Sequence, residues 1–312
     1  MENLIKLDAY PVKDVLKQLL KDKTTRKNII FATDAYSSIN NIINAKSQIT
    51  VGLLLGFDAC VIQPRVQKSQ EEQAERTRKK AEVFTPSWIC NKMNNHCDEE
   101  WFGRTNVFNI ENNDQTWTIN EEMIEFSEGK TWKQYVDSKR LEITCGEAPY
   151  IVSRYDAATG ELIPVQNRIG ILDRKLRIVN ENTNSEKDWF AWVIRAYQSV
   201  YGYEFQGDNL LIARINLLYT FVDYMQYKWN RIPTDEEIKK ITNIIVWNLW
   251  QMDGITGLVP YGEPKEEYHQ VSLFDFVLGE GKKLPDDTEV ECKIYDWRRD
   301  NSIKYNRLKE QN

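Results

Sequence analysis

The sequence predicts an α/β fold preceded by a mixed, mainly helical N-terminal extension. From residue 83 onward, short apolar runs alternate with stretches of helical periodicity, a pattern typical of α/β proteins. Before that point, residues 67–82 form a charged run with almost no apolar residues. A chain of 312 residues is long enough for one large core with an additional arm. We therefore expect two regions, 1–82 and 83–312.

The N-terminal extension begins with a short helix. Apolar residues at helical spacing predict an amphipathic helix within residues 11–22. Residues 28–32, 51–55 and 60–64 are short apolar runs that fit strands or buried segments.

The charged run at residues 67–82 predicts a solvated helix. Glu72 and Arg76 form a favourable i,i+4 pair, and so do Glu75 and Lys79. An exposed connecting helix is one interpretation of this run. The other is an arm that follows a phosphate backbone, built from Arg76, Arg78, Lys79 and Lys80.

Strands and helices are expected to alternate in the main region. The expected strands cover residues 140–144 and 200–204, with a late strand at 290–295. The expected helices are residues 189–200, 208–227 and 235–250.

Composition and charge restrict the class of partner. A net charge of −6 provides no global field that draws the chain onto nucleic acid, so a DNA contact must come from a local basic patch or a partner chain. The 10 tryptophans and 15 tyrosines suit cores and interfaces, although aromatic rings also stack on bases. The sequence has no apolar signal segment and no membrane-length run, so we expect a cytoplasmic protein without membrane contact.

The five cysteines are scattered and odd in number. Cys90, His96 and Cys97 are close enough in sequence to suggest a zinc site, but no fourth ligand accompanies them. Reduced thiols are the better account, and no metal is expected.

A helix start, a turn and a strand end carry the residue types of a ligand site. Thr85 and Pro86 form a favourable helix start, and a helix N-terminus can bind an anion through its free N–H groups. The strand at 140–144 leads into a turn at Gly146, where the backbone can approach a ligand closely. The strand at 200–204 ends on Glu204, whose ionised carboxylate can accept hydrogen bonds from ribose hydroxyls.

Each of these features also has an explanation without a ligand: a capped helix, a structural turn and a carboxylate facing water. The hypothesis that they form one site makes a geometric prediction. The turn at Cys145 and Gly146 and the carboxylate of Glu204 should converge on a single nucleoside-sized cleft.

Three segments, residues 81–90, 141–149 and 201–207, together resemble the cofactor-binding half of adenine-N6 DNA methyltransferases of restriction–modification systems. The likeness extends over most of residues 76–255. The chain is similar to the group described as restriction endonuclease subunit M and to type IIS methylases. It implies a Rossmann-like, S-adenosylmethionine-dependent methyltransferase domain. It also implies DNA and another restriction–modification subunit as partners.

The resemblance implies a role for each matching residue. Phe84, Thr85 and Pro86 would lie beside the amino-acid end of S-adenosylmethionine. Glu204 would bind the ribose, and Phe205 would flank the adenine ring. The turn around the methionine part of the cofactor would be formed by Glu142, Thr144, Cys145, Gly146 and Glu147.

Asp253 is the acidic residue that the resemblance implies near the adenine amino group. Gly254 follows it and would act as a left-handed stop after the helix at 235–250. The two roles are not exclusive.

The sequence departs from the family's pattern at the glycine turn. Glu142 replaces an aspartate, Ile143 stands where proline is usual, and Ala148 replaces the second glycine.

The acidic position is also displaced. Glu204 follows Gly146 by 58 positions, whereas such folds place the acid about 20 residues on. We therefore expect an insertion at about 154–182, looped out between strand and helix. Its basic residues suit either an alternating salt-bridged surface or a DNA-backbone contact. They are Arg168, Arg174, Lys175 and Arg177.

The family's catalytic loop is missing. A methyltransferase acting on a duplex must extrude the base and hold it, which the family does with an Asn/Asp-Pro-Pro-aromatic loop. The 9 prolines here include no Pro-Pro pair. Neither Val259-Pro260-Tyr261 nor Asp296-Trp297 is a convincing substitute, so no catalytic residue is assigned.

Three functional hypotheses remain open. The first is an S-adenosylmethionine-dependent DNA adenine methyltransferase with a degenerate loop. The second is a non-catalytic module that binds cofactor or DNA and complements a partner chain. The third is an unrelated nucleotide-binding α/β protein that shares only the turn geometry. The order of the motifs favours the first two, and the missing loop favours the second over the first.

Overall fold

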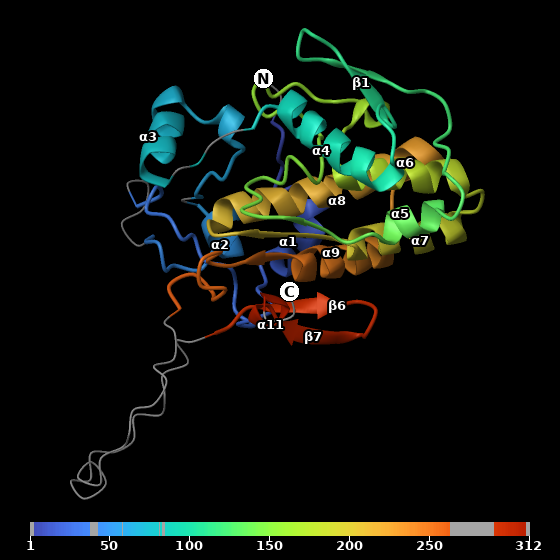
Figure 1. The fold of residues 1–312 in the computed structure, drawn as a ribbon. Coiled ribbons are helices and arrows are strands. Elements are labelled where there is room, and N and C mark those ends of the chain that lie inside the picture. Colours follow the sequence, from blue (N-terminus) through green and yellow to red (C-terminus); the bar gives the residue numbers. More distant parts are fainter. Residues whose placement is uncertain are drawn as a thin grey trace, which may run out of the picture.

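The computed structural model describes residues 3–37, 43–57, 59–80, 82, 85–262 and 290–309, and Figure 1 shows their arrangement. The helices are α1 Val12–Leu19, α2 Val51–Leu55, α3 Gln70–Lys80, α4 Ser87–Phe102, α5 Trp132–Asp137, α6 Ile171–Asn182, α7 Glu186–Gln198, α8 Gly207–Trp229, α9 Asp235–Asn248 and α11 Asn306–Lys309. The strands are β1 Asn109–Glu111, β2 Trp117–Ile119, β3 Arg140–Glu142, β4 Val200–Glu204, β5 Leu249–Gln251, β6 Lys293–Asp296 and β7 Asn301–Lys304. Within this described part, no helix combines the length and the apolar character needed to cross a membrane.

A three-stranded parallel sheet organises the main region. Its order is β3-β4-β5, so β4 is paired on both sides. Parallel strands need crossover connections. Along the chain, α6 and α7 lie between β3 and β4, and α8 and α9 lie between β4 and β5. The predicted α/β class is thus confirmed as a mixed α/β structure with a parallel sheet.

Most predicted elements appear close to their expected positions. The strands predicted at 140–144 and 200–204 are confirmed as β3 and β4. The apolar run at 51–55 forms α2 rather than a strand, because the Thr50 side chain caps it by accepting from the Leu53 N–H. The helix predicted at 235–250 ends at Asn248, and the chain then becomes extended as β5.

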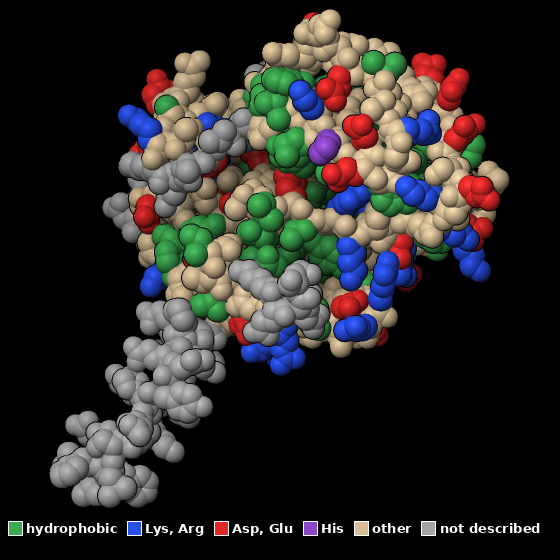
Figure 2. Space-filling view, viewed as in Figure 1, with side chains coloured by type: hydrophobic (Ala, Val, Ile, Leu, Met, Phe, Trp, Pro, Cys, Tyr) green, Lys and Arg blue, Asp and Glu red, His purple; other side chains and the backbone are tan. Residues whose placement is uncertain are grey.

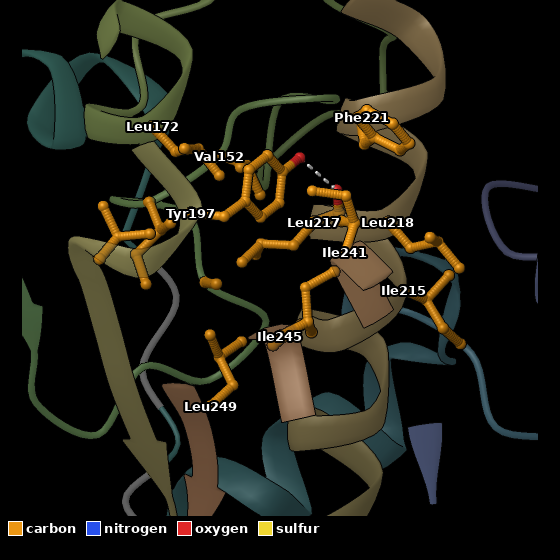
Figure 3. Packing of buried hydrophobic residues seen from close by; sticks show 14 of the residues in the cluster. Val152, Leu172, Tyr197, Ile215, Leu217, Leu218, Phe221, Ile241, Ile245 and Leu249 are labelled. Atoms are coloured by element: carbon orange, nitrogen blue, oxygen red, sulfur yellow. Dashed lines mark hydrogen bonds between the residues drawn. The ribbon is translucent and has the colours of Figure 1, made fainter. Parts of the chain in front are cut away.

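The two faces of the sheet are covered differently. Side chains alternate along each strand, so neighbouring residues of β5 point to opposite faces. Leu249 belongs to the main core, where Figure 3 shows Ile241 of α9 and Leu217 of α8. Tyr203 and Trp250 belong to a second cluster with residues of the β6–β7 hairpin, which lies at the bottom of Figure 1.

Helix α8 is buried on nearly all sides, which exceeds the single apolar face that the sequence predicts. Several of its polar residues are buried with internal partners. Arg214 donates to the carbonyl oxygens of Leu249, Leu19 and Lys21, and so links α8 to β5 and α1. Burial lowers the pKa of Arg214 to about 10, and Asp22 opposes this shift.

The first 82 residues share a core with the rest of the chain. Val12 and Leu16 of α1 belong to the same hydrophobic cluster as Ile241 of α9. The Tyr10 hydroxyl also donates to the Pro233 carbonyl at 3.0 Å.

The stretch at 154–182 is not looped out, contrary to the prediction. Its second half forms α6, and the side chains of Leu172, Leu176 and Val179 lie in the main core. These apolar residues recur at helical spacing, which the neighbouring basic residues obscure in the sequence.

Candidate functional site

A cleft of about 910 Å³ opens at the carboxyl ends of β3 and β4. Figure 2 shows a hollow with hydrophobic side chains around it and acidic side chains inside. In parallel α/β sheets, this end of the strands is the usual place for a ligand. Residues of α4, β3, β4 and the first turn of α8 line the cleft, including Thr85, Met93, Glu142, Thr144, Gly146, Tyr150, Glu204, Phe205 and Asn209.

The turn after β3 holds three residues in the left-handed conformation. Thr144, Gly146 and Ala148 have φ angles of 47°, 53° and 64°. A Cβ added to Gly146 would meet nothing within 4 Å, so its φ angle, and not crowding, favours glycine there. Cys145 is buried beneath the turn, and its N–H donates to the Tyr203 carbonyl of β4 at 2.8 Å.

Glu204 meets this turn directly. One of its carboxylate oxygens accepts from the Gly146 N–H at 2.9 Å, and the other accepts from the Gln206 N–H at 3.0 Å. The residue is 6% exposed. Burial raises the pKa of Glu204 to about 6, although both N–H groups oppose the shift. The predicted convergence of the glycine turn and the strand-end carboxylate on one cleft is therefore present in the structure.

Glu142 supplies a second carboxylate to the cleft wall. Burial raises the pKa of Glu142 well above its ordinary value, against the N–H groups of Tyr150 and Ile151. One of its oxygens, Oε2, is inaccessible to solvent and has no hydrogen-bond partner among the described residues. Glu142 therefore gives the cleft wall a buried carboxyl group whose protonated form is favoured.

Glu147 is turned toward internal partners. Its carboxylate accepts from the Arg65 N–H at 2.7 Å and from the Tyr155 hydroxyl at 2.6 Å. Burial raises the pKa of Glu147, and the Tyr155 hydroxyl and Arg65 N–H oppose this shift. These contacts make Glu147 a support of the turn.

The predicted helix start is displaced by one residue. Pro86, with φ −55° and ψ 148°, is the N-cap of α4, and no side chain caps the helix there. Thr85 lines the cleft as predicted, but it does not cap α4. Phe84 lies outside the residues that the structure describes.

Asp253 closes its own turn. Its carboxylate accepts from the N–H groups of Ile255 and Thr256, and it does not line the cleft. Gly254 is not a left-handed helix stop either, because α9 has already ended and the chain reaches Gly254 from β5.

The basic residues predicted to contact DNA form no exposed patch. Arg174 is 1% exposed and donates to Asp98 and Asn91. Lys175 is fully buried, and its ammonium group donates to the Val136 carbonyl. Burial lowers the pKa of Lys175 well below its ordinary value, and Arg140 adds to this shift.

The remaining basic residues are also paired. Arg168 donates to Asp223 at 2.6 Å, and Arg177 pairs with Glu181 one turn along α6. Arg76 cannot contact a phosphate backbone as part of a basic arm, because it is buried and paired with Asp208. These contacts correct the DNA-contact prediction, because the charges of these residues are used inside the fold.

Tyr150 and Asn209 line the cleft but were not predicted from the sequence. Asn209 lies in the first turn of α8, five residues after Glu204, and the spacing alone indicates that it faces the same strand end. Tyr150 belongs to the turn after Gly146, where the sequence offers no comparable pattern.

Comparisons with protein-family models, curated proteins and solved structures found no match to this chain. In the described ranges, no group of three His, Cys, Asp or Glu side chains is arranged to hold a metal ion. The function of the cleft is therefore inferred from its own residues.

Proposed function

We propose that this chain is the S-adenosylmethionine-binding, methyltransferase-like subunit M of a restriction–modification or phage-defence system, with a Rossmann-like fold. The observation that supports this most is the hydrogen bond between the Gly146 N–H and the Glu204 carboxylate. This bond joins the glycine turn after β3 to the acidic residue at the end of β4, the neighbouring parallel strand. Dinucleotide- and nucleoside-binding α/β folds have this arrangement.

The strand order supports the same fold. In the doubly wound order 3-2-1-4-5-6, the first strand carries the glycine turn and the second lies beside it. Here β3 carries the turn, β4 lies beside it, and β5 follows on the far side of β4. The order β5-β4-β3 thus corresponds to the 3-2-1 half of such a sheet.

The residues of the cleft fit S-adenosylmethionine. A volume of about 910 Å³ lies within the range of small-molecule sites. Glu204 retains lone pairs for ribose hydroxyls beyond its two backbone donors. Glu142 adds a second carboxyl group to the wall of the same cleft. Ala148 also fits the family pattern, because it has the positive φ angle that a second glycine would adopt without strain.

S-adenosylmethionine supplies an activated methyl group when it is bound. The chain's own residues would bind and orient this group: Glu204 would hold the nucleoside end, and the turn at Gly146 would lie beside the amino-acid end. The loop that grips the target base is absent from the sequence, because no Pro-Pro pair occurs. We therefore infer that the base is held by a polypeptide segment other than these 312 residues, and that DNA is contacted mainly through that segment.

One contact favours a second candidate, a complete adenine methyltransferase with a degenerate loop. Tyr261, which follows Pro260, packs its ring edge-on against Phe205 in the cleft wall, with 5.7 Å between ring centroids. An aromatic ring at this position could stack on an extruded base. In this candidate, Tyr261→Ala abolishes methyl transfer to DNA by the isolated chain, whereas the subunit proposal expects no transfer even by the wild type.

Calorimetry tests the cofactor proposal. S-adenosylmethionine should bind the wild type, and Glu204→Gln should weaken binding at least tenfold. Asp173→Asn is the matched control, because Asp173 is also buried with a raised pKa but lies outside the cleft. NAD is the competing ligand, and preferential binding of NAD would support the unrelated nucleotide-binding hypothesis instead. No heat with S-adenosylmethionine would remove the proposal.

A further inference from the structure

Helix α3 reaches the cleft through one buried cation, Arg76. The helix lies at the left of Figure 1, and most of its described side chains are exposed. Arg76 is only 5% exposed, and it donates through Nη2 to Asp208 and through Nε to Glu82, both at 2.8 Å. Burial lowers the pKa of Arg76, but the carboxylates of Asp208 and Glu82 outweigh burial and raise it overall. The guanidinium is therefore a permanent charge inside the fold.

Two side-chain amides complete this network. The side-chain oxygens of Gln206 and Asn209 accept from Nη2 of Arg76 at 3.3 Å and 3.4 Å. Their NH₂ groups donate to Oε2 of Glu82, also at 3.3 Å and 3.4 Å. An amide turned by 180° would place its NH₂ group against the guanidinium and its oxygen against the carboxylate. The Arg76–Glu82 pair therefore fixes which way both amides face.

The groups that Arg76 holds belong to the cleft. Glu82, Gln206 and Asn209 line the cleft. Arg76 does not line it, and so acts on these side chains from behind the wall. The backbone N–H of Gln206 also donates to Glu204 at 3.0 Å, which connects the network to the carboxylate at the end of β4.

A second contact attaches the same segment to the glycine turn. The N–H of Arg65, which precedes α3, donates to the Glu147 carboxylate at 2.7 Å, and the Arg65 side chain donates to Thr77 of α3 at 2.6 Å. The segment from Arg65 to Glu82 thus contacts both the turn after β3 and the first turn of α8. Both of these turns border the cleft, so α3 is part of the site's support and not only a solvated connection.

We propose that Arg76 is a positioning residue of the cofactor cleft, and that it holds Gln206 and Asn209 in the orientation that a bound ligand meets. The inference rests on the proposed function, because that function assigns S-adenosylmethionine to this cleft. With both amide oxygens turned toward Arg76, each amide keeps one N–H that donates to no described residue. This side of the cleft therefore favours a ligand group with acceptor atoms, such as ring nitrogens or a carboxylate.

Calorimetry with S-adenosylmethionine tests the inference on the full chain. Arg76→Lys keeps a cation for Asp208 and Glu82 and should fold, but an ammonium group lacks the planar fork that serves all four acceptors. This variant should bind the cofactor about tenfold more weakly, the loss expected for about one misplaced hydrogen bond. Arg168→Lys is the matched control, because the Arg168 side chain is also 6% exposed and ion-paired, but lies outside the cleft. Its affinity should equal that of the wild type.

A double-mutant cycle shows whether Arg76 acts through the amides. Asn209→Ala removes one positioned amide and should itself weaken cofactor binding. Because Arg76 works partly through Asn209, the double variant should lose clearly less affinity than the product of the two single losses. Losses that simply multiply would show two independent effects and would overturn the inference.

NMR spectra of the unliganded protein provide a readout that needs no cofactor. The side-chain NH₂ resonances of Gln206 and Asn209 should be dispersed and slow to exchange in the wild type and in Arg168→Lys. In Arg76→Lys they should move toward those of free amides. Glu82→Gln removes the other charge of the pair, so it should free the same amides and serves as the second variant if Arg76→Lys does not fold.

Unchanged amide resonances in the folded variants, or an Arg76→Lys affinity equal to that of the wild type, would overturn the inference. The two proposals can also fail separately. Amides that become mobile in Arg76→Lys, in a wild type that shows no heat with S-adenosylmethionine, would sink the proposed function and leave the positioning role of Arg76 standing.

Discussion

Cofactor affinity should depend on the protonation of Glu204. Burial raises the pKa of this carboxyl to about 6, with small contributions from Asp208 and Glu82, against the N–H groups of Gln206 and Gly146. A carboxylate accepts hydrogen bonds from ribose hydroxyls better than a protonated carboxyl does. At pH 5, roughly a tenth of Glu204 is ionised, so the dissociation constant for S-adenosylmethionine should be about tenfold higher than at pH 7.5.

The assay is isothermal titration calorimetry between pH 5 and pH 8. The wild type should show a transition centred near pH 6, and Glu204→Gln should bind weakly at every pH. Asp173 provides the control, because burial raises its pKa to about 6 as well, while its carboxylate accepts from the Ser153 N–H away from the cleft. An Asp173→Asn variant that lost the transition, or a wild type whose affinity did not change across this range, would refute the reasoning.

The same shift predicts a dependence of stability on pH. A carboxyl whose pKa is raised on folding binds protons more tightly in the folded state, so the free energy of unfolding falls as pH rises between the two pKa values. For Glu204, the rise from 4.5 to about 6 corresponds to roughly 2 kcal/mol, lost between about pH 4.5 and pH 6. Glu204→Gln should flatten this part of the stability profile in urea denaturation. An unchanged profile would contradict the burial of Glu204.

Four further substitutions test the contacts that support the site. Arg214→Met should lower the free energy of unfolding by roughly 3 kcal/mol or more in urea denaturation, because several buried carbonyl groups lose their donor. A loss below about 1 kcal/mol would contradict the role of Arg214 as the donor that links α8 to β5 and α1. Gly146→Ala should lower the free energy of unfolding by about 1–2 kcal/mol, because alanine is strained at the positive φ angle of this position. Gly207→Ala should lower it far more, since the added Cβ would lie 1.9 Å from the Ile30 carbonyl oxygen. Thermal denaturation should rank the two variants in this order. Arg174→Met should destabilise the fold by roughly 3–5 kcal/mol through the unpaired Asp98, without changing the DNA affinity of the folded fraction in fluorescence anisotropy; a specific loss of DNA affinity would restore the predicted contact.

Local patterns in the sequence were sufficient to place the cleft. A strand that runs into Gly146 and a strand that ends on Glu204 are each encoded by consecutive residues, and β3 and β4 appear where these patterns predict. Their convergence follows from parallel pairing, since the carboxyl ends of parallel strands meet at one edge of the sheet.

The errors arise where burial depends on distant residues. Arg174 and Lys175 have the spacing of a solvated surface, and only the packing of α6 against α4 and α5 shows that their charges are used internally. Asp253 has the residue type of a nucleoside ligand, yet the turn after β5 uses its carboxylate for backbone N–H groups. The partners of Arg174 and Lys175 lie far away in sequence, so neighbouring residues do not reveal them. The partners of Asp253 are local, but the residue type alone does not distinguish a turn acceptor from a ligand-binding carboxylate.

A crystal structure of the chain with S-adenosylhomocysteine tests the central claim most directly. We expect both ribose oxygens within about 3.2 Å of the Glu204 carboxylate, with the amino-acid end of the ligand over the turn at Gly146. A ligand bound outside this cleft, or an empty cleft at saturating ligand, would contradict the account.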